Sequence, residues 1–218
     1  LGELVDGITH YVDNPECTID DLMRFVTGPD FPTGATICGT RQIESMYKLG
    51  RGQMVVRGKA EIVEYKNKEA IIITEIPYTV NKASMIEKMA DLVNEKVIEG
   101  ISDIRDESSS DGIRVVVELK RGALGQVVLN NLYKHTQLQT TFGAIMLAID
   151  QGRPKVMNLK ELFRAYVDHR FEVITRRTKF ELAKAEARKH ILEGLLIALD
   201  HLDEVVAIIR SSKNRDEA

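Results

Sequence analysis

The chain of 218 residues is 44% hydrophobic and 29% charged, and its formal net charge is -3. This length and apolar content can supply the core of one large domain or of two small ones. A weakly acidic chain does not bind polyanions through its overall charge, so any contact with nucleic acid would need a local basic patch.

The cysteine content favours a reduced intracellular protein. Cys17 and Cys38 stand alone, without a C-x-x-C motif and without a histidine at metal-ligand spacing, which argues against a zinc site and a disulfide framework. No apolar run approaches the roughly 18 residues of a membrane span, and the amino end lacks the pattern of a signal peptide. We therefore expect a cytoplasmic protein without membrane contact. Because the sequence lacks a start methionine, we also expect a piece of a larger protein.

Residues 1–49 are predicted to form a helical and irregular lead-in. Apolar residues in 1–26 recur at spacings of three and four, which indicates two short helices, and Thr18 is a suitable cap for the second. The segment 28–39, GPDFPTGATICG, has two prolines and three glycines and is predicted to be irregular for most of its length. A short helix that ends at Gly50 follows.

Residues 50–83 are predicted to form two long strands joined by a short basic turn and followed by a helix. Side chains alternate across a strand, so the first strand has an apolar face (Met54, Val56, Gly58, Ala60, Ile62) and a charged face (Val55, Arg57, Lys59, Glu61). From Lys48 to Lys68 six basic residues outnumber two acidic ones (Lys48, Arg51, Arg57, Lys59, Lys66, Lys68; Glu61, Glu64). This excess of four positive charges is the local basic patch of the chain.

The next elements continue the alternation of strands and helices. A helix capped by Asn81 precedes two strands at 101–105 and 113–120, which flank a polar link. Another helix leads to an extended run over 138–149. The order of hairpin, helix, hairpin, helix and strand predicts an α+β fold, a mostly antiparallel sheet with helices on one face, which we assign to residues 50–153.

Residues 154–218 are predicted to contain one long projecting helix. Asn158 and Glu161 form a capping box, and no glycine or proline follows until Gly194. A helix of about 40 residues reaches roughly 60 Å, which exceeds the needs of a compact domain. Its apolar stripe requires a partner, so we expect it to associate or to fold back through residues 180–209.

The candidate binding residues are cations of the central strands. Arg57 and Lys59 are predicted to point the same way from one strand with Arg51 at its base, and such a surface suits backbone phosphates without reading bases. Arg41 and Lys82 are second candidates. A solvated charged surface is the alternative, and it is favoured for the basic run of the long helix (His169, Arg170, Arg176, Arg177, Lys179). The scattered histidines and acids indicate neither a catalytic nor a metal site.

Several blocks of the sequence closely resemble the family of DNA gyrase A subunits, and the topoisomerase IV A subunit is the near relative. The resemblance covers essentially the whole chain. Its blocks are PDFPTG (29–34), GRG (50–52), TEIPYTVNKA (74–83), EGISDIRDES (99–108), VVLNNLYKHTQLQTTFG (127–143), GRPKVMNLKELF (152–163) and TRRTKFELAKAEARKHILEGLLIALD (175–200).

The resemblance implies an ATP-dependent type IIA DNA topoisomerase, which cuts one duplex, passes another through it and reseals it. It implies that residues 50–153 are the tower domain and that 154–218 begin the coiled-coil arm to the exit gate. The implied partners are duplex DNA and the gyrase B subunit, in an A2B2 heterotetramer, and ATP and magnesium act on the partner subunit. No tyrosine here has the arginine neighbour of the family's catalytic tyrosine, so this region is expected to be inactive alone and to hold no cofactor.

Two functional hypotheses follow. In the first, this region supports and bends the gate DNA during negative supercoiling and links it to the exit gate. In the second, it is a purely structural module that transmits motion without touching DNA. A variant of the first hypothesis assigns the chain to the same region of the topoisomerase IV A subunit.

Overall fold

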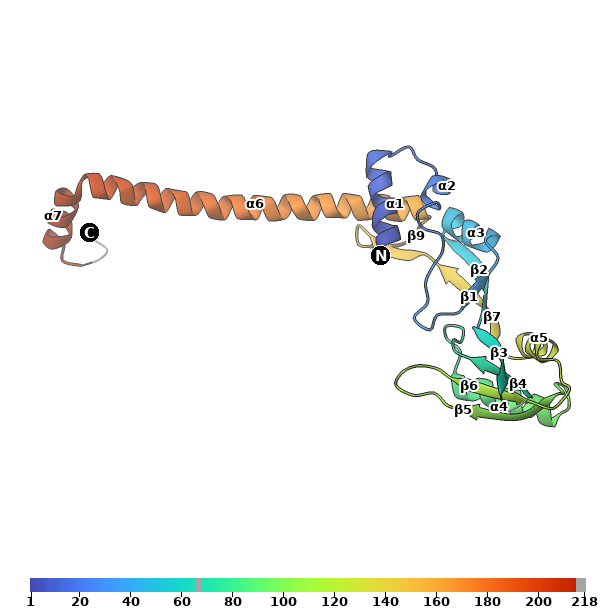
Figure 1. Cartoon of the computed structure of the whole chain (residues 1–218). Coiled ribbons are helices and arrows are strands. Elements are labelled where there is room, and N and C mark those ends of the chain that lie inside the picture. Colours follow the sequence, from blue (N-terminus) through green and yellow to red (C-terminus); the bar gives the residue numbers. More distant parts are fainter. Residues whose placement is uncertain (66–67, 215–218) are drawn as a thin grey trace. The chain divides into compact units, whose positions relative to one another are not determined.

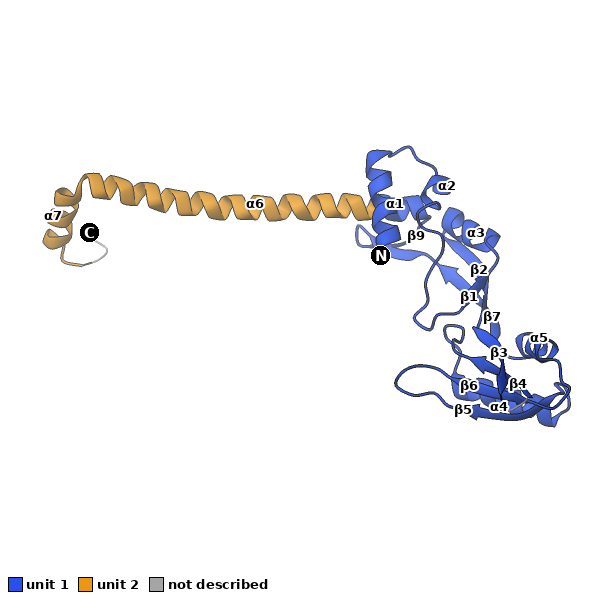
Figure 2. Cartoon of the chain, viewed as in Figure 1, with its two compact units in different colours: residues 1–164 blue, residues 165–218 orange. Residues whose placement is uncertain are grey.

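The computed structural model describes residues 1–65 and 68–214. It has an α+β fold with antiparallel sheets and a long helix, as predicted (Figure 1). The chain divides into two compact units, Leu1–Arg164 and Ala165–Ala218 (Figure 2). Lys66, which was counted in the basic patch, lies outside the described residues. The division at 49/50 and 153/154 stays a prediction.

The amino-terminal segment contains α1 (Gly2–Asp13), α2 (Ile19–Leu22), β1 (Thr36–Cys38) and α3 (Arg41–Leu49). Thr18 caps α2 as predicted, because its hydroxyl accepts from the Asp21 amide while the Asp21 carboxylate accepts from the Thr18 amide. The glycine-rich segment contributes the short strand β1, which its composition did not indicate. β1 exists because it pairs with β2.

A first antiparallel sheet, called sheet A, has the strand order β1, β2 (Arg51–Arg57) and β7 (Gln139–Ile145). One face of β2 buries Met54 and Val56, and α3 packs on that face, since a Cβ atom at Gly52 would lie 2.9 Å from Cβ of Met46. The core on this side draws on α2 and the residues that flank it, on α3, β2 and the start of α6 (Cys17, Leu22, Val26, Ile43, Met46, Tyr47, Met54, Leu159, Phe163), and Ile8 and Tyr11 of α1 pack against it.

The predicted long first strand was wrong, because β2 ends at Arg57 and β3 (Ala60–Tyr65) belongs to a different sheet. The break lies at Gly58, where an added Cβ atom would be 2.6 Å from both the Glu75 carbonyl oxygen and Cδ1 of Leu138. The Gly58 amide donates to Leu138 O over 2.8 Å, whereas the Lys59 amide donates to Glu75 O over 3.0 Å. The chain therefore changes partner strand across the Gly58–Lys59 peptide.

The second antiparallel sheet, called sheet B, has the order β3, β4 (Lys68–Ile73), β6 (Val115–Leu119) and β5 (Ile101–Asp106). Helices α4 (Lys82–Asn94) and α5 (Gly125–His135) share one buried core with one face of this sheet. Asn81 caps α4 by accepting from the Ser84 amide. The core is built from both layers (Ile71, Ile73, Ile76, Met85, Met89, Leu92, Ile98, Ile101, Val115, Val117, Leu119, Val128, Leu129, Leu132, Leu138).

A separate hairpin follows β7. β8 (Leu147–Asp150) pairs with β9 (Arg153–Val156), and Gln151 and Gly152 form the two-residue turn with positive φ angles of 49° and 78°. The predicted extended run over 138–149 thus covers β7 and most of β8.

Helix α6 (Leu159–Asp200) has 42 residues and begins with the predicted capping box, in which Asn158 and Glu161 bond each other's amides. The short helix α7 (Leu202–Ser211) follows it. Large apolar side chains are exposed along both helices (Tyr166, Phe171, Ile174, Phe180, Leu182, Ile191, Leu192, Leu195, Leu196, Ile197, Leu199, Leu202, Val206, Ile208, Ile209). None of the helices described meets the length and apolarity that crossing a bilayer requires.

Candidate nucleic-acid interface

One face of sheet A carries no acidic residue. Residues directly opposite in an antiparallel pair share a face, so the registers of β1, β2 and β7 define its members. We call this the open face; it comprises Thr36, Cys38, Arg51, Gln53, Val55, Arg57, Gln139, Thr141, Gly143 and Ile145. Arg51, Gln53 and Thr141 are exposed. A Cβ atom at Gly143 would have no neighbour within 4 Å, so this face is not covered by another element there.

Arg57 is the cation of the open face whose guanidinium is held by neighbouring side chains. Its Nε and Nη2 atoms both donate to Oε1 of Gln139, over 2.9 and 2.7 Å. Its guanidinium carbon lies 4.5 Å from the centroid of the Tyr133 ring, a cation–π geometry. The Tyr133 hydroxyl in turn donates to Gly58 O over 3.1 Å. The half-buried Arg57 therefore has one preferred position rather than many.

Arg51 and Lys59 are both exposed, but they do not flank Arg57 on one strand. Arg51 begins β2 and shares the open face with Arg57. Lys59 lies in the two-residue link between β2 and β3, so the prediction that it shares a strand with Arg57 was wrong. Its part in binding stays a prediction.

The two second candidates lie elsewhere. Arg41 is the exposed first residue of α3, which packs on the covered face of sheet A. Lys82 is the first residue of α4, and its ammonium lies 2.7 Å from Oδ2 of Asp106. This contact, together with hydrogen bonds from Ser108, lowers the pKa of Asp106 to about 2. Much of the charge of Lys82 is thus already matched by an acid.

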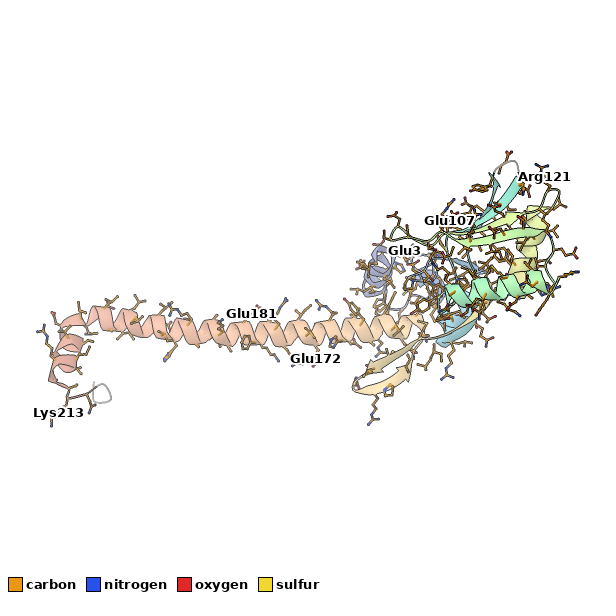
Figure 3. The ribbon with its side chains drawn as sticks, turned by 90° about the horizontal axis from the view of Figure 1, so that it is seen from below. Glu3, Glu107, Arg121, Glu172, Glu181 and Lys213 are labelled. Atoms are coloured by element: carbon orange, nitrogen blue, oxygen red, sulfur yellow. The ribbon has the colours of Figure 1, made fainter. Side chains whose placement is uncertain are left out.

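The face of sheet B that lies away from its helices has a different electrostatic character. Arg105 pairs there with Glu118 at 2.6 Å, Asp103 at 3.1 Å and Glu107 at 3.4 Å. These carboxylates, Glu118 above all, raise the pKa of Arg105 further above its ordinary value. Figure 3 labels Glu107, which also pairs with Arg114. Because acids outnumber bases in this network, this face suits a phosphate backbone poorly.

Several cations of α6 are paired with acids. Glu172 with Arg176 (3.4 Å), and Arg177 with Glu181 (3.8 Å), form pairs one helical turn apart, and Figure 3 labels both glutamates. Such pairs are typical of a solvated helix face, which was the favoured interpretation of this basic run.

A cavity of about 420 Å³ lies near the amino end of α5. Lys68, Lys120 and Arg121 line it, but so do Glu64 and Glu69. The Glu69 carboxylate accepts from the Gly125 amide over 2.7 Å and so already occupies the helix terminus. Among the residues that the structure describes, no three metal-ligand side chains gather into a site.

Sequence reasoning missed the uncharged residues of the candidate site, which are Gln139, Thr141 and Thr36 on the open face and Tyr133 of α5 beside Arg57. Their place depends on strand register and on the packing of α5, which no local pattern reveals. The absence of acidic residues from the open face likewise depends on how the three strands pair, which the sequence does not reveal.

Comparison with known proteins gives a consistent result. The family model for the A subunits of DNA gyrase and topoisomerase IV matches residues 1–218. The chain is 56% identical to the DNA gyrase A subunit of Clostridium acetobutylicum, over all of this chain and 26% of that protein. It is 53% identical to the DNA gyrase A subunit of Haemophilus influenzae, over all of this chain and 25% of that protein. A probable chloroplastic/mitochondrial DNA gyrase A subunit of Oryza sativa is 54% identical over 98% of this chain and 23% of its own length. The chain thus spans about a quarter of the length of these relatives.

Proposed function

Because the chain belongs to the family of DNA gyrase and topoisomerase IV A subunits, we propose that it is the part of a DNA topoisomerase that supports the gate duplex. In this proposal the open face of sheet A holds backbone phosphates, and the arm that begins with α6 links the DNA to the exit gate. The full-length subunit works with the gyrase B subunit in a cytoplasmic A2B2 assembly during ATP-dependent negative supercoiling. Strand cleavage is carried out by a tyrosine outside these residues, and ATP and magnesium act on the partner subunit.

The observation that carries the proposal is the charge of the open face. Its two charged residues, Arg51 and Arg57, are both basic, and its polar members are uncharged donors and acceptors such as Gln53 and Thr141. Such a surface binds phosphates without reading bases, as an enzyme that acts on many sequences requires. Bending a duplex costs a few kcal/mol, and phosphate contacts of this kind offset that cost.

We expect the triple variant Arg51→Ala, Arg57→Ala and Lys59→Ala to bind duplex DNA about 10- to 100-fold more weakly at low salt, because up to three phosphate contacts are lost. Each phosphate contact releases counterions, so the slope of log affinity against log salt should become shallower by about 0.9 for each phosphate contact that is removed. The measurement is a salt titration of duplex binding by the full-length subunit in complex with its partner, with DNA bending followed in parallel.

The matched control also removes three positive charges, but away from the open face, through Lys88→Ala, Lys96→Ala and Arg121→Ala. All three of these basic residues are exposed. This control should keep the wild-type slope and DNA bending. Equal slopes for the triple variant and for wild type would refute the DNA-supporting role and favour the purely structural module.

A specific observation supports the role of α6 as an arm. Its exposed apolar side chains extend over most of its 42 residues, far more than an isolated solvated helix carries. A second helix packed along these side chains would bury them. In this proposal the region combines a DNA-facing sheet with the first helix of a paired arm.

A further inference from the structure

Arg57 is held on two sides by groups that leave its charge uncompensated. Oε1 of Gln139 accepts from both Nε and Nη2, and the Tyr133 ring lies against one face of the guanidinium. The Tyr133 ring is itself anchored, because its hydroxyl donates to Gly58 O. Nη1 has no hydrogen bond to any residue that the structure describes. One donor group therefore stays available for a ligand.

We propose that Gln139 and Tyr133 are positioning residues that fix the Arg57 guanidinium for a backbone phosphate of duplex DNA. This inference rests on the proposed function. A free arginine side chain loses rotamer freedom when it binds, and a guanidinium that is already fixed loses less. Gln139 comes from β7 and Tyr133 from α5, so a neighbouring strand and a helix jointly orient the last residue of β2.

The neutral amide at position 139 is central to this inference. Elsewhere the same chain holds an arginine with carboxylates, since Arg105 pairs with Asp103, Glu107 and Glu118. Such partners cancel the charge of the arginine. The single carbonyl oxygen of Gln139 accepts from Arg57 as one carboxylate oxygen would, but it carries no negative charge, so Arg57 keeps its attraction for a polyanion.

The test compares duplex affinity and its salt dependence in the full-length subunit in complex with its partner. Arg57→Ala should bind about tenfold more weakly, with a salt slope shallower by about 0.9. Gln139→Leu should bind about threefold more weakly with an unchanged slope, because the charge of Arg57 remains. In the Arg57→Ala background, Gln139→Leu should have no further effect, because Gln139 acts through Arg57.

Three further variants and one control keep the test independent of folding. Gln139→Glu preserves the shape of the side chain but neutralises Arg57, so it should lower both affinity and slope to the level of Arg57→Ala. Tyr133→Leu removes the ring and should bind about threefold more weakly, whereas Tyr133→Phe keeps the ring but loses its hydrogen bond to Gly58 O and should fall between Tyr133→Leu and wild type. The control Gln137→Leu changes an exposed glutamine two residues away and should have no effect.

Different outcomes would overturn the positioning role of Gln139 and the proposed function. If Gln139→Leu weakens binding equally with and without Arg57, or if Gln139→Glu leaves the slope unchanged, Gln139 does not position Arg57. In either case the triple removal of Arg51, Arg57 and Lys59 would still reduce affinity. If that triple variant binds as wild type, the proposed function itself fails.

Discussion

Gly58→Ala is expected to destabilise the chain by about 2–3 kcal/mol, near the upper end of what one added methyl group costs in a packed site. The new Cβ atom would meet the Glu75 carbonyl oxygen and the Leu138 side chain, each at 2.6 Å. Relief requires Leu138 or Glu75 to move away, which would weaken the hydrogen bond from the Gly58 amide to Leu138 O or the one from the Lys59 amide to Glu75 O. The chain passes from sheet A to sheet B at the Gly58–Lys59 peptide, so both sheets should lose stability together.

Urea unfolding monitored by circular dichroism measures this effect, and Gly143→Ala is the matched control. Gly143 lies on the open face of β7 in sheet A, where a Cβ atom would have no neighbour within 4 Å. Alanine there should change the free energy of unfolding by less than about 1 kcal/mol. Equal stabilities for the two alanine variants would show that close packing at Gly58 does not separate β2 from β3.

Leu132→Ala is expected to cost about 3 kcal/mol, since removing a fully buried leucine side chain costs about 2–5 kcal/mol. Leu132 has 0% exposure and packs α5 against sheet B. The effect should reach the candidate site, because the next residue, Tyr133, contacts Arg57. We therefore expect DNA affinity to fall even at temperatures where the variant remains folded.

Val127→Ala provides the comparison within the same helix, because Val127 is 53% exposed. It should change stability by less than about 1 kcal/mol and leave DNA binding as in wild type. Thermal unfolding and duplex binding measured on the same samples separate the two effects. A Leu132→Ala variant with wild-type stability would contradict the described packing of α5.

Sequence reasoning succeeded where the signal is local. The caps at Thr18 and Asn81 and the capping box at Asn158 depend on residues three positions apart, and all three are present. The β5–β6 pair and helix α6 follow from periodicity that changes little with tertiary context. The α+β class followed from the order of these elements.

Sequence reasoning failed where residues far apart in the sequence determine where a strand begins or ends. The alternation of apolar and charged residues continues through Gly58 without a break, so a single long strand was the natural interpretation of 50–65. The strand ends because Glu75 and Leu138, far along the chain, approach the backbone too closely for a side chain. β1 likewise forms only because it pairs with β2.

The candidate site shows the same division. Charge made Arg51 and Arg57 candidates, and the register of β2 and β7 places both on one face, while their contact with DNA stays a prediction. Lys59 was misplaced because its predicted orientation assumed a continuous strand. The clamp of Gln139 and Tyr133 could not be predicted, because it joins residues from β7 and α5 to the end of β2.

Site-specific cross-linking tests the DNA-facing role of the open face most directly. Gln53→Cys places a thiol on the exposed centre of that face, and Glu61→Cys places one on sheet B, on the face away from its helices. Both are made in a Cys38→Ser background, because Cys38 shares the open face. With a duplex that carries a thiol tethered to its backbone, the full-length assembly should cross-link efficiently through position 53 and hardly through position 61. Equal yields at the two positions, or none at position 53, would contradict the account.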